Sequence, residues 1–461
     1  MAVKGPPSHL TTVSAALASG ESTAGELLDH CLERIAKRDG SLNSFVHADL
    51  DGARVAARDS DARRAAGTTL SPIDGVPISI KDNLLVRGMP ATWGSRALAQ
   101  YVPDHDELPV ARLRAAGAVI IGKTNVPELT LEGYTSNELF GVTRNPWDER
   151  LTPGGSSGGA AAGVAAGLVP AAIGTDGGGS IRRPACHTGL VGWKPSIGHV
   201  PRRDGFPAIL TDFEVIGTLT PTVADAALLD AILSGPETGD RWPRLPAPAA
   251  ETLRPARILF IPRFGARPVD RQVAAVAKGF AELLEQRGHA IETGDVFFDL
   301  DEFARIWQVV SRSGVVWLMA NGGWNLRELA GRSVQAMAAD GATISGADYF
   351  EALDRTNALR RRCDELFSRY DYVLTPTAAA LPWAADTPYP SEIAGEPAGP
   401  RDHAIFTGWV NAAGLPAISL PVGASSSGLP IGVQLVGGFG RDLALLQFAQ
   451  NLDQPTAAAI A

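Results

Sequence analysis

The sequence predicts an α/β fold built on a mixed β-sheet. Short β-branched runs flanked by glycine recur along the chain, as at residues 76–80 and 119–121, and such runs are typical of buried strands. Segments with helical periodicity, such as 223–233, alternate with these runs. No internal repeat divides the chain. We therefore expect a single domain that spans residues 1–461.

The first 65 or so residues have a helical pattern. Thr23 and Glu26 form a capping box, in which two side chains satisfy exposed amides at the start of a helix. The apolar residues that follow recur at helical spacing: Leu27, Leu28, Cys31, Leu32 and Ile35. This pattern predicts an amphipathic helix that covers the core.

The later elements continue the alternation along the chain. The predicted segments are a small-residue helix at 160–168, strands at 171–173 and 258–261, helices at 223–233 and 270–287, and strands near residues 290 and 372. Residues 235–256 are rich in Pro, Gly and Ala, and we interpret them as a connection rather than a domain boundary.

Composition narrows the class of function. A net charge of −9 argues against nucleic acid as a partner, because phosphate binding needs a basic surface. Three cysteines are too few to suggest a disulfide framework. The amino terminus has no apolar leader, and the most apolar stretch, residues 160–174, is broken by glycine and proline and too short to span a bilayer. We expect a soluble, cytoplasmic protein with no membrane partner.

Two glycine-rich segments, residues 154–159 and 174–182, are the strongest chemical signal. Glycine at this density is costly unless the backbone needs unusual dihedral angles or close approach. The run Gly177-Gly178-Gly179 before Ser180 exposes successive amides that could hold an oxyanion. A flexible surface linker is the alternative, but the apolar segment 169–173 should anchor this loop in the core.

Ser180 needs a base if it is a nucleophile. None of the eight histidines lies in a pattern that nominates it, and His187 is the nearest in sequence. A lysine can act instead if burial keeps it neutral, and Lys81 follows the apolar run 76–80. Taken alone, a lysine at a strand end is as easily structural.

Three motifs together resemble those of the amidase signature family. They are the Lys81-Asp82 strand end, the glycine box 154–159 and the loop 174–182, in this order and at that family's spacing. Three further segments are similar to family landmarks: Asn145-Pro146-Trp147, Gly192-Trp193-Lys194-Pro195 and residues 411–417. The resemblance covers essentially the whole chain. It implies that family's fold, a large mixed β-sheet covered by helices on both faces.

By this resemblance the domain has three parts. Residues 1–68 are the amino-terminal helical covering segment, and residues 69–235 are the catalytic core. Residues 236–461 are the variable half that completes the sheet and forms the substrate pocket.

The resemblance also assigns catalytic roles. Ser180 is the nucleophile that becomes acylated, Ser156 follows a cis peptide bond and relays a proton, and Lys81 is the base. The backbone amides of Gly177, Gly178, Gly179 and Ser180 would receive the oxyanion. Water then hydrolyses the acyl-enzyme. Neither a metal nor an organic cofactor is implied.

Residues around this centre are given supporting roles by the same resemblance. Asp176 and Arg182 would form a charged hydrogen-bond pair that fixes the loop, although a surface ion pair is the simpler alternative. Ser157 would support Ser156. Thr130 is expected to line the acyl pocket, with Ser156 also contacting substrate.

Residues 117–124 match the phosphate-loop pattern G-x-x-x-x-G-K-[ST] only formally. The pattern requires a loop between a strand and a helix, whereas the intervening residues here are themselves a predicted strand. The sequence has no HExxH segment, paired CxxC or histidine cluster, so we expect neither nucleotide nor metal binding.

The predicted function is hydrolysis of a small carboxamide or arylamide to an acid plus ammonia or an amine. The same motifs fit a glutaminase-type amidotransferase component that works with a partner protein. A binding protein without catalysis is the third alternative, which the intact Lys81, Ser156 and Ser180 argue against. The substrate is a small-molecule amide under the first of these hypotheses, and a homodimer is compatible with it.

The substrate itself is not predicted. Five aromatic residues of the variable half could line a pocket or pack in the core: Trp307, Trp317, Trp324, Phe406 and Trp409. For an acidic carbamoyl-type substrate, the candidate partners are Arg202, Arg203 and Arg312.

Overall fold

The computed structural model describes residues 9–238 and 254–452. The helices are α1 (Leu10–Ser19), α2 (Ala24–Leu42), α3 (Leu50–Ala65), α4 (Leu108–Ala115), α5 (Gly158–Ala165), α6 (Arg182–Thr188), α7 (Val223–Leu233), α8 (Arg271–Gln286), α9 (Leu300–Asn321), α10 (Leu326–Leu329), α11 (Arg332–Gly341), α12 (Gly346–Phe367), α13 (Gly408–Ala412) and α14 (Asp442–Leu452). Short 3-10 helices are η1 (Arg96–Leu98), η2 (Glu128–Thr130) and η3 (Asp402–Ala404).

Eleven strands form one mixed sheet in the order β1-β3-β2-β6-β8-β7-β14-β15-β11-β9-β10. Their bounds are β1 (Phe45–Ala48), β2 (Pro77–Lys81), β3 (Val119–Thr124), β6 (Ala172–Asp176), β7 (Val191–Lys194), β8 (Val215–Thr220), β9 (Arg257–Phe260), β10 (Ala290–Thr293), β11 (Tyr372–Pro376), β14 (Ala417–Ala424) and β15 (Pro430–Gly437). β2 is parallel to β3 and β6, and β9 is parallel to β10 and β11. The other neighbours are antiparallel. The short strands β4 (Ser136–Asn137) with β5 (Gly141–Val142), and β12 (Glu392–Ile393) with β13 (Glu396–Pro397), form two small hairpin sheets.

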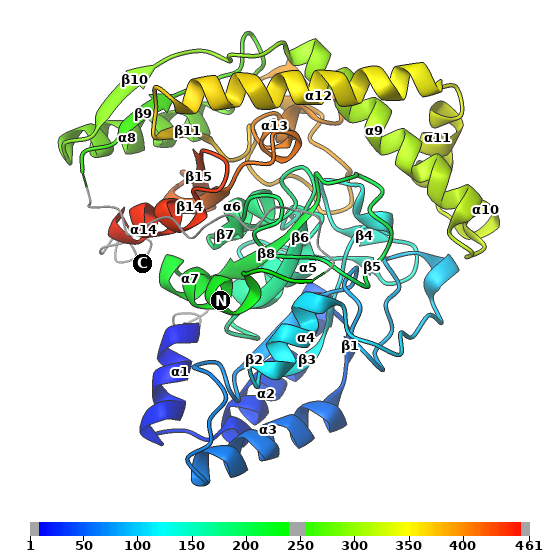
Figure 1. Ribbon diagram of the computed structural model, residues 1–461, viewed down its shortest axis with the longest axis vertical. Helices are drawn as coiled ribbons and strands as arrows, with labels where there is room; N and C mark the ends of the chain where they lie inside the picture. The colour runs from blue at the N-terminus through cyan, green and yellow to red at the C-terminus, as the bar shows by residue number, and fades with distance from the viewer. Residues whose placement is uncertain (1–8, 239–253, 453–461) are drawn as a thin grey trace.

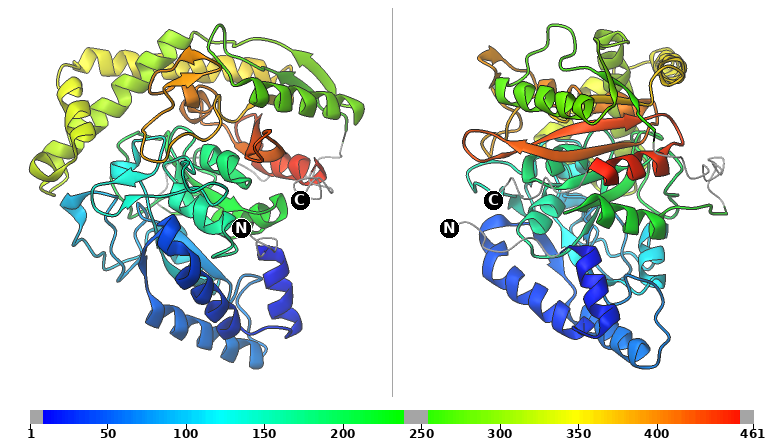
Figure 2. Two further views of the ribbon diagram at one scale, coloured as in Figure 1. Left: turned by 180° about the vertical axis from the view of Figure 1, so that it is seen from behind. Right: turned by 90° about the vertical axis from the view of Figure 1, so that its left-hand side faces the viewer.

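Helices cover both faces of this sheet, as predicted. Along β11, Tyr372 and Leu374 pack into a cluster with α8 and α14, whereas Val373 between them packs into the cluster of α9 and α12. Such alternation follows from the two-residue period of a strand. Figures 1 and 2 show α1, α2 and α3 at one end of the molecule and α9 to α12 at the opposite end.

The predicted elements are present with small shifts in their bounds. The capping box at the start of α2 is confirmed, because Thr23 Oγ1 accepts from the Glu26 amide at 3.1 Å and a Glu26 carboxylate oxygen accepts from the Thr23 amide at 2.9 Å. The amino-terminal segment is not helical throughout, however. Strand β1 lies within it and pairs with β3 at the sheet edge. It is short and only half-buried, so the sequence carries no clear strand pattern there.

The sheet brings the chemical motifs to one edge. Lys81 is the last residue of β2, and Asp176 is the last residue of its parallel neighbour β6. Because the carboxyl ends of parallel strands meet at the same edge, the lysine and the glycine-rich loop after Asp176 lie side by side. The glycine box runs into the first residues of α5, which contacts β2 and β6, and Ser156 lies just before this helix.

Most of the formal phosphate-loop match, residues 119–124, forms strand β3. Gly122, Lys123 and Thr124 all belong to β3, which is fully buried. The Lys123 ammonium pairs with a carboxylate oxygen of Asp82 at 3.1 Å, and both side chains are buried. This lysine therefore forms a buried structural ion pair and is not available to bind a phosphate.

Candidate active site

Lys81 lies fully buried at the end of β2. Its Nζ lies 2.8 Å from Ser156 Oγ, 2.9 Å from Thr175 Oγ1 and 3.1 Å from the Thr175 carbonyl oxygen. Burial lowers the pKa of Lys81 to about 7, and the nearby carboxylates of Glu214 and Asp176 oppose that shift. A lysine of this pKa is substantially neutral at pH 7, and its lone pair can then accept a proton from the Ser156 hydroxyl.

Ser156 follows a cis peptide bond, the one that the resemblance implies. Gly155 before it lies against the backbone of Tyr134, where an added Cβ would come within 2.5 Å of the Tyr134 carbonyl oxygen. Glycine is therefore required at position 155 to bring the serine this close to Lys81.

Ser180 begins the turn into α6 and is 7% exposed, at the wall of a cavity. The Ser157 amide donates to the Ser180 carbonyl oxygen at 3.1 Å, and the Ser157 hydroxyl donates to the Thr175 carbonyl at 3.2 Å. Ser157 thus ties the two motifs together. In the described part of the chain no hydrogen bond joins the Ser156 and Ser180 hydroxyls, so this step of the relay stays a prediction.

Asp176 organises the loop that leads to Ser180. Its carboxylate accepts from the amides of Gly179 at 2.7 Å and Ile181 at 3.1 Å. It also accepts two hydrogen bonds from the guanidinium of Arg182, at 2.8 and 3.0 Å. Burial would raise the pKa of Asp176, but the Arg182 guanidinium holds it well below its usual range. The predicted charged pair is present and fully buried, so it is not a surface ion pair.

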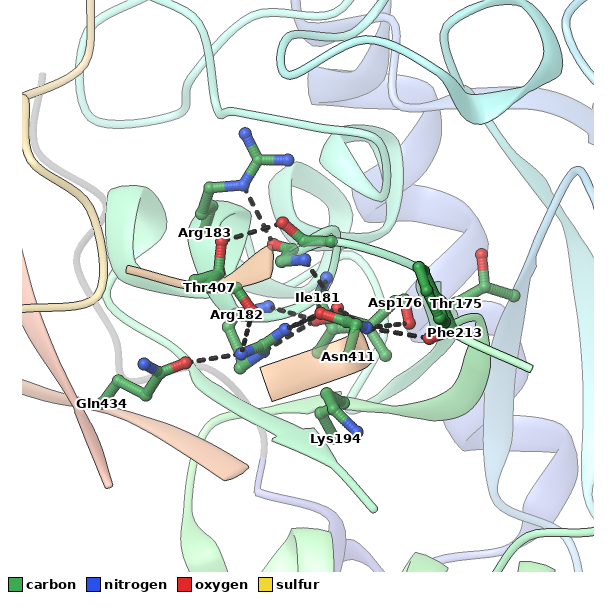
Figure 3. Close-up of polar contacts among 12 residues, drawn as sticks. Thr175, Asp176, Ile181, Arg182, Arg183, Lys194, Phe213, Thr407, Asn411 and Gln434 are labelled. Atoms are coloured by element: carbon green, nitrogen blue, oxygen red, sulfur yellow. Dashed lines mark hydrogen bonds and ion pairs between the residues drawn. The ribbon is translucent and has the colours of Figure 1, made fainter. Parts of the chain in front are cut away.

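Arg182 is held in turn by residues far away in the sequence. Its Nη1 donates to the side-chain oxygen of Gln434 at 2.5 Å and to the Thr407 carbonyl at 3.2 Å, and Nη2 donates to the side-chain oxygen of Asn411 at 2.5 Å (Figure 3). Asn411 also donates to the Asp176 carbonyl at 2.7 Å. Asn411 belongs to a landmark segment of the sequence, whereas Thr407 and Gln434 gave no signal.

Fewer backbone amides are free to bind an oxyanion than the sequence predicts. The Gly179 amide is already used by Asp176 and is not available to a ligand in this arrangement. Among the described residues, the amides of Gly177, Gly178 and Ser180 have no acceptor. All three residues line the cavity, so they are the remaining candidates for the oxyanion hole.

A cavity of about 520 Å³, here called the chamber, opens in front of Ser180. One wall is apolar and is formed by Leu210, Leu300, Phe303, Trp307, Met337 and Ile405. Thr130, for which a place in the acyl pocket is predicted, is among the residues that line the chamber, and its hydroxyl accepts from the Trp93 indole at 3.2 Å. The loop that ends in Ser180 therefore borders a mixed apolar and polar pocket of ligand size.

One of the five aromatic candidates lines the chamber. Trp307 does so, and a Cβ on Gly178 would lie 2.4 Å from its ring. Phe406 and Trp409 are completely buried in the core. Trp324 packs edge-on against Phe206 instead. Trp317 is 50% exposed.

The arginines proposed for an acidic substrate all have carboxylate partners. Arg202 pairs with Glu107 at 2.8 Å and Glu214 at 2.6 Å. Arg203 pairs with Asp204 at 3.0 Å. Arg312 lines the chamber but pairs with Asp340.

Sequence reasoning missed three other chamber arginines, Arg183, Arg267 and Arg401. Arg183 follows Ser180 by three residues, and this proximity is the one sequence signal that could have pointed to it. Arg401 lies far from every catalytic motif along the chain, so no local pattern could have found it.

His187 is an unsuitable base. It is fully buried against Trp383, and burial lowers its pKa to about 3, with Arg183 adding to the shift. Within residues 9–238 and 254–452, no group of three or more His, Cys, Asp or Glu side chains is placed to hold a metal ion. No helix of the described chain is long and apolar enough to cross a membrane.

Comparison with known proteins identifies the family of this chain. The sequence profile of the Amidase family matches residues 26–446. The chain belongs to the amidase signature family. It is thus an amidase-family enzyme, and enzymes of this family act on C–N bonds.

Individual relatives of this amidase-family chain fall into two groups. It is 35% identical to the A subunit of the glutamyl-tRNA(Gln) amidotransferase of Synechococcus sp. strain CC9605, over 95% of this chain and 94% of that protein. The corresponding protein of Chloroflexus aggregans is 36% identical over 93% of each chain. Among solved structures, a bacterial aryl acylamidase of the family superposes with a TM-score of 0.88 at 28% identity, covering 99% and 98% of the two chains. The A subunit of the Thermotoga maritima amidotransferase has a TM-score of 0.76 at 28% identity, covering 98% and 95%.

Proposed function

We propose that this amidase-family enzyme hydrolyses the C–N bond of a carboxamide through an acyl-enzyme on Ser180. Neutral Lys81 takes the proton of Ser156, and Ser156 takes the proton of Ser180 as that hydroxyl attacks the amide carbonyl. The same route returns a proton to the leaving nitrogen, so that ammonia or an amine departs. Water then attacks the acyl ester and releases the acid.

The observation that carries this proposal is the buried contact between Lys81 and Ser156 beside the glycine loop of Ser180. A buried lysine whose pKa lies near neutrality can act as a general base at neutral pH. The amides of Gly177, Gly178 and Ser180, which have no acceptor among the described residues, would stabilise the oxyanion in this mechanism. Loss of one such donor typically lowers turnover by about 10²–10³.

Two finer functions share this chemistry. The curated relatives favour a glutaminase-type amidotransferase component, because the two named above belong to amidotransferases and are about 35% identical to this chain. The chamber favours a stand-alone amidase, because a 520 Å³ space with an apolar wall is larger than a primary amide such as glutamine requires. We propose the stand-alone amidase on this geometry and keep the amidotransferase component as the second candidate.

Turnover by the isolated chain separates these functions. Purified protein is incubated with glutamine and with aliphatic and aryl amides, and ammonia, amine and acid are measured. Hydrolysis of amides larger than glutamine without any partner supports the stand-alone amidase. Glutaminase activity that appears only with an added amidotransferase partner supports the second candidate. If neither the isolated chain nor the chain with its added partner shows turnover or serine labelling, the result supports a binding protein.

A further inference from the structure

Two of the arginines that line the chamber lack an acidic partner among the described residues. Four arginines line it: Arg183, Arg267, Arg312 and Arg401. Arg267 lies 3.4 Å from Asp402, and Arg312 lies 3.4 Å from Asp340. In the part of the chain that the structure describes, no carboxylate oxygen lies within 4.0 Å of Arg183 or Arg401. These two guanidinium groups are therefore candidates for a ligand.

Arg183 is fixed in the chamber wall beside the nucleophile. It lies in the first turn of α6 and is 4% exposed. Its Nε donates to the Gly179 carbonyl at 3.3 Å, and Nη1 donates to His403 Nε2 at 2.8 Å. In Figure 3 the guanidinium points away from the Arg182 cluster. The remaining N–H groups on Nη1 and Nη2 have no protein acceptor among the described residues.

The surroundings keep Arg183 in place without neutralising its charge. Burial and the neighbouring Arg183 and Arg401 hold the pKa of His403 well below its usual value, so His403 stays a neutral acceptor. An added Cβ on Gly133 would lie 2.8 Å from Arg183 Nη1, so glycine leaves the space that the guanidinium fills. Burial lowers the pKa of Arg183 to about 9, with the charge of Arg401 adding to that shift.

Arg401 approaches the same loop from another direction. Its guanidinium lies 4.2 Å from the centre of the Trp307 ring, and that ring lies over Gly178. This stacking is a favourable cation–π arrangement that orients the planar group. Arg401 is exposed, in contrast to Arg183. The two guanidinium groups thus flank the loop that ends in Ser180.

None of the acidic side chains that line the chamber forms an ion pair with Arg183 or Arg401. Glu214 pairs with Arg202, and Asp402 pairs with Arg267. Glu132 accepts from the Ser333 hydroxyl at 2.5 Å and does not contact either cation. Desolvation lowers the pKa of Arg401 to about 10, and the charge of Glu132 opposes that shift only in part. A buried cation without a counter-ion is costly, and the cost is relieved when an anion binds to it. A guanidinium also matches a carboxylate geometrically, because two N–H groups can donate in parallel.

We propose that Arg183, assisted by Arg401, binds a carboxylate group of the substrate close to its scissile amide. The inference rests on the proposed function, since it concerns the same chamber and the same nucleophile. The carboxylate can belong to the acyl part, as in a monoamide of a dicarboxylic acid, or to the amine part, as in an N-acyl amino acid. Its position relative to Ser180 distinguishes these two sources.

Direct binding tests the inference without requiring turnover. The Ser180→Ala protein is titrated calorimetrically with succinamate and with N-acetylglycine, and with their neutral counterparts succinamide and N-acetylglycinamide. We expect at least one carboxylate probe to bind about 10- to 100-fold more tightly than its neutral counterpart, as for a charge-assisted hydrogen bond. The probe that shows this preference identifies the side on which the carboxylate lies.

Substitution of the arginines then locates the preference. With Arg183→Met added, the advantage of the carboxylate probe should be lost, while the neutral probe should change less than about threefold. Arg183→Lys should recover part of the advantage, and Arg401→Met should reduce it less because Arg401 is exposed. Arg305→Met is the control, since Arg305 is an exposed residue of α9 that pairs with Asp348. Melting temperatures establish that each variant is folded.

Some outcomes overturn the inference. Equal affinity for charged and neutral probes in the Ser180→Ala protein would overturn it, as would equal losses for both probes with Arg183→Met. Binding that depends on Arg183, together with wild-type protein that hydrolyses no amide and is not labelled at Ser180, would preserve the inference and reject the proposed function. Amide hydrolysis by the wild-type protein without any preference for a carboxylate would preserve the proposed function and reject the inference.

Discussion

The ammonium nitrogen of Lys81 lies 2.8 Å from the hydroxyl oxygen of Ser156, and both side chains are buried. Desolvation makes the charged form of this lysine unfavourable, which is why its pKa falls to about 7. A surface lysine in the same contact would stay protonated and could only donate. In the proposed mechanism, the burial of this pair is therefore what allows a strand-end lysine to act as the base.

The pH dependence of turnover should report the ionisation of Lys81. The base is the neutral form, which predominates above the pKa, so kcat/KM should rise with pH through about 7 and level off above it. Lys81→Met should lose most activity across this range while it remains folded by circular dichroism. A rate that falls as pH rises from about 6 to about 8, or a Lys81→Met protein with near-wild-type turnover, would contradict this role.

Removing the charge of Asp176 should destabilise the protein strongly. Asp176→Asn leaves the Arg182 guanidinium buried without its counter-ion, and breaking a buried pair in this way costs about 3–5 kcal/mol of unfolding free energy. Denaturant unfolding measures the loss. Asp148→Asn is the matched control, because its partner Arg150 is exposed and the expected change is under about 1 kcal/mol. Equal losses in the two variants would refute the structural role of Asp176.

A methyl group on Gly178 should block the loop. The added Cβ would lie 2.4 Å from the Trp307 ring, so either the ring or the amide at position 178 must move. We expect Gly178→Ala to lower kcat by about 10²-fold, as for loss of one oxyanion donor. Gly279→Ala in α8 is the control, since no atom lies within 4 Å of its added Cβ. Unchanged turnover in Gly178→Ala would remove this amide from the oxyanion hole.

Two tryptophans of α9 should respond differently to truncation. Trp307 lines the chamber, whereas Trp317 on the same helix is 50% exposed. Trp307→Ala should raise KM for aryl amides by about tenfold or more, because the aromatic contact with substrate is lost. Trp317→Ala should change KM less than about threefold. Similar effects of both truncations on KM would argue against substrate contact with Trp307.

Local patterns predicted much of the fold. The helix at 223–233 has the bounds predicted from its helical periodicity, and at its start the Thr222 hydroxyl accepts from the Asp225 amide. Strand β1 was missed because a four-residue, half-buried edge strand has almost no alternation to detect. The mixed sheet itself was predicted from the alternation of strands and helices, but the strand order depends on contacts between distant segments.

Only the part of the candidate site that lies within the sequence motifs was predicted. Lys81, Ser156 and Ser180 lie in segments whose residue types and order are informative. Gln434, by contrast, contacts Arg182 across 252 positions of the chain, and no local pattern reports such a contact.

Whether an arginine is available to bind a ligand depends on which side chains surround it in the folded protein. Arg183 has no carboxylate partner among the described residues, whereas Arg202 has two. Both arginines look alike in the sequence, because each is one of two adjacent arginines, Arg182-Arg183 and Arg202-Arg203. Only the packed structure distinguishes them.

Labelling of the nucleophile tests the proposed function most directly. Wild-type protein and the Ser180→Ala variant are treated with a fluorophosphonate, digested, and the modified peptide is located by mass spectrometry. An adduct on Ser180 in the wild type, absent from the folded Ser180→Ala variant together with amide hydrolysis, is the predicted result. An adduct on a different residue, or amide hydrolysis that survives in Ser180→Ala, would contradict an acyl-enzyme on Ser180.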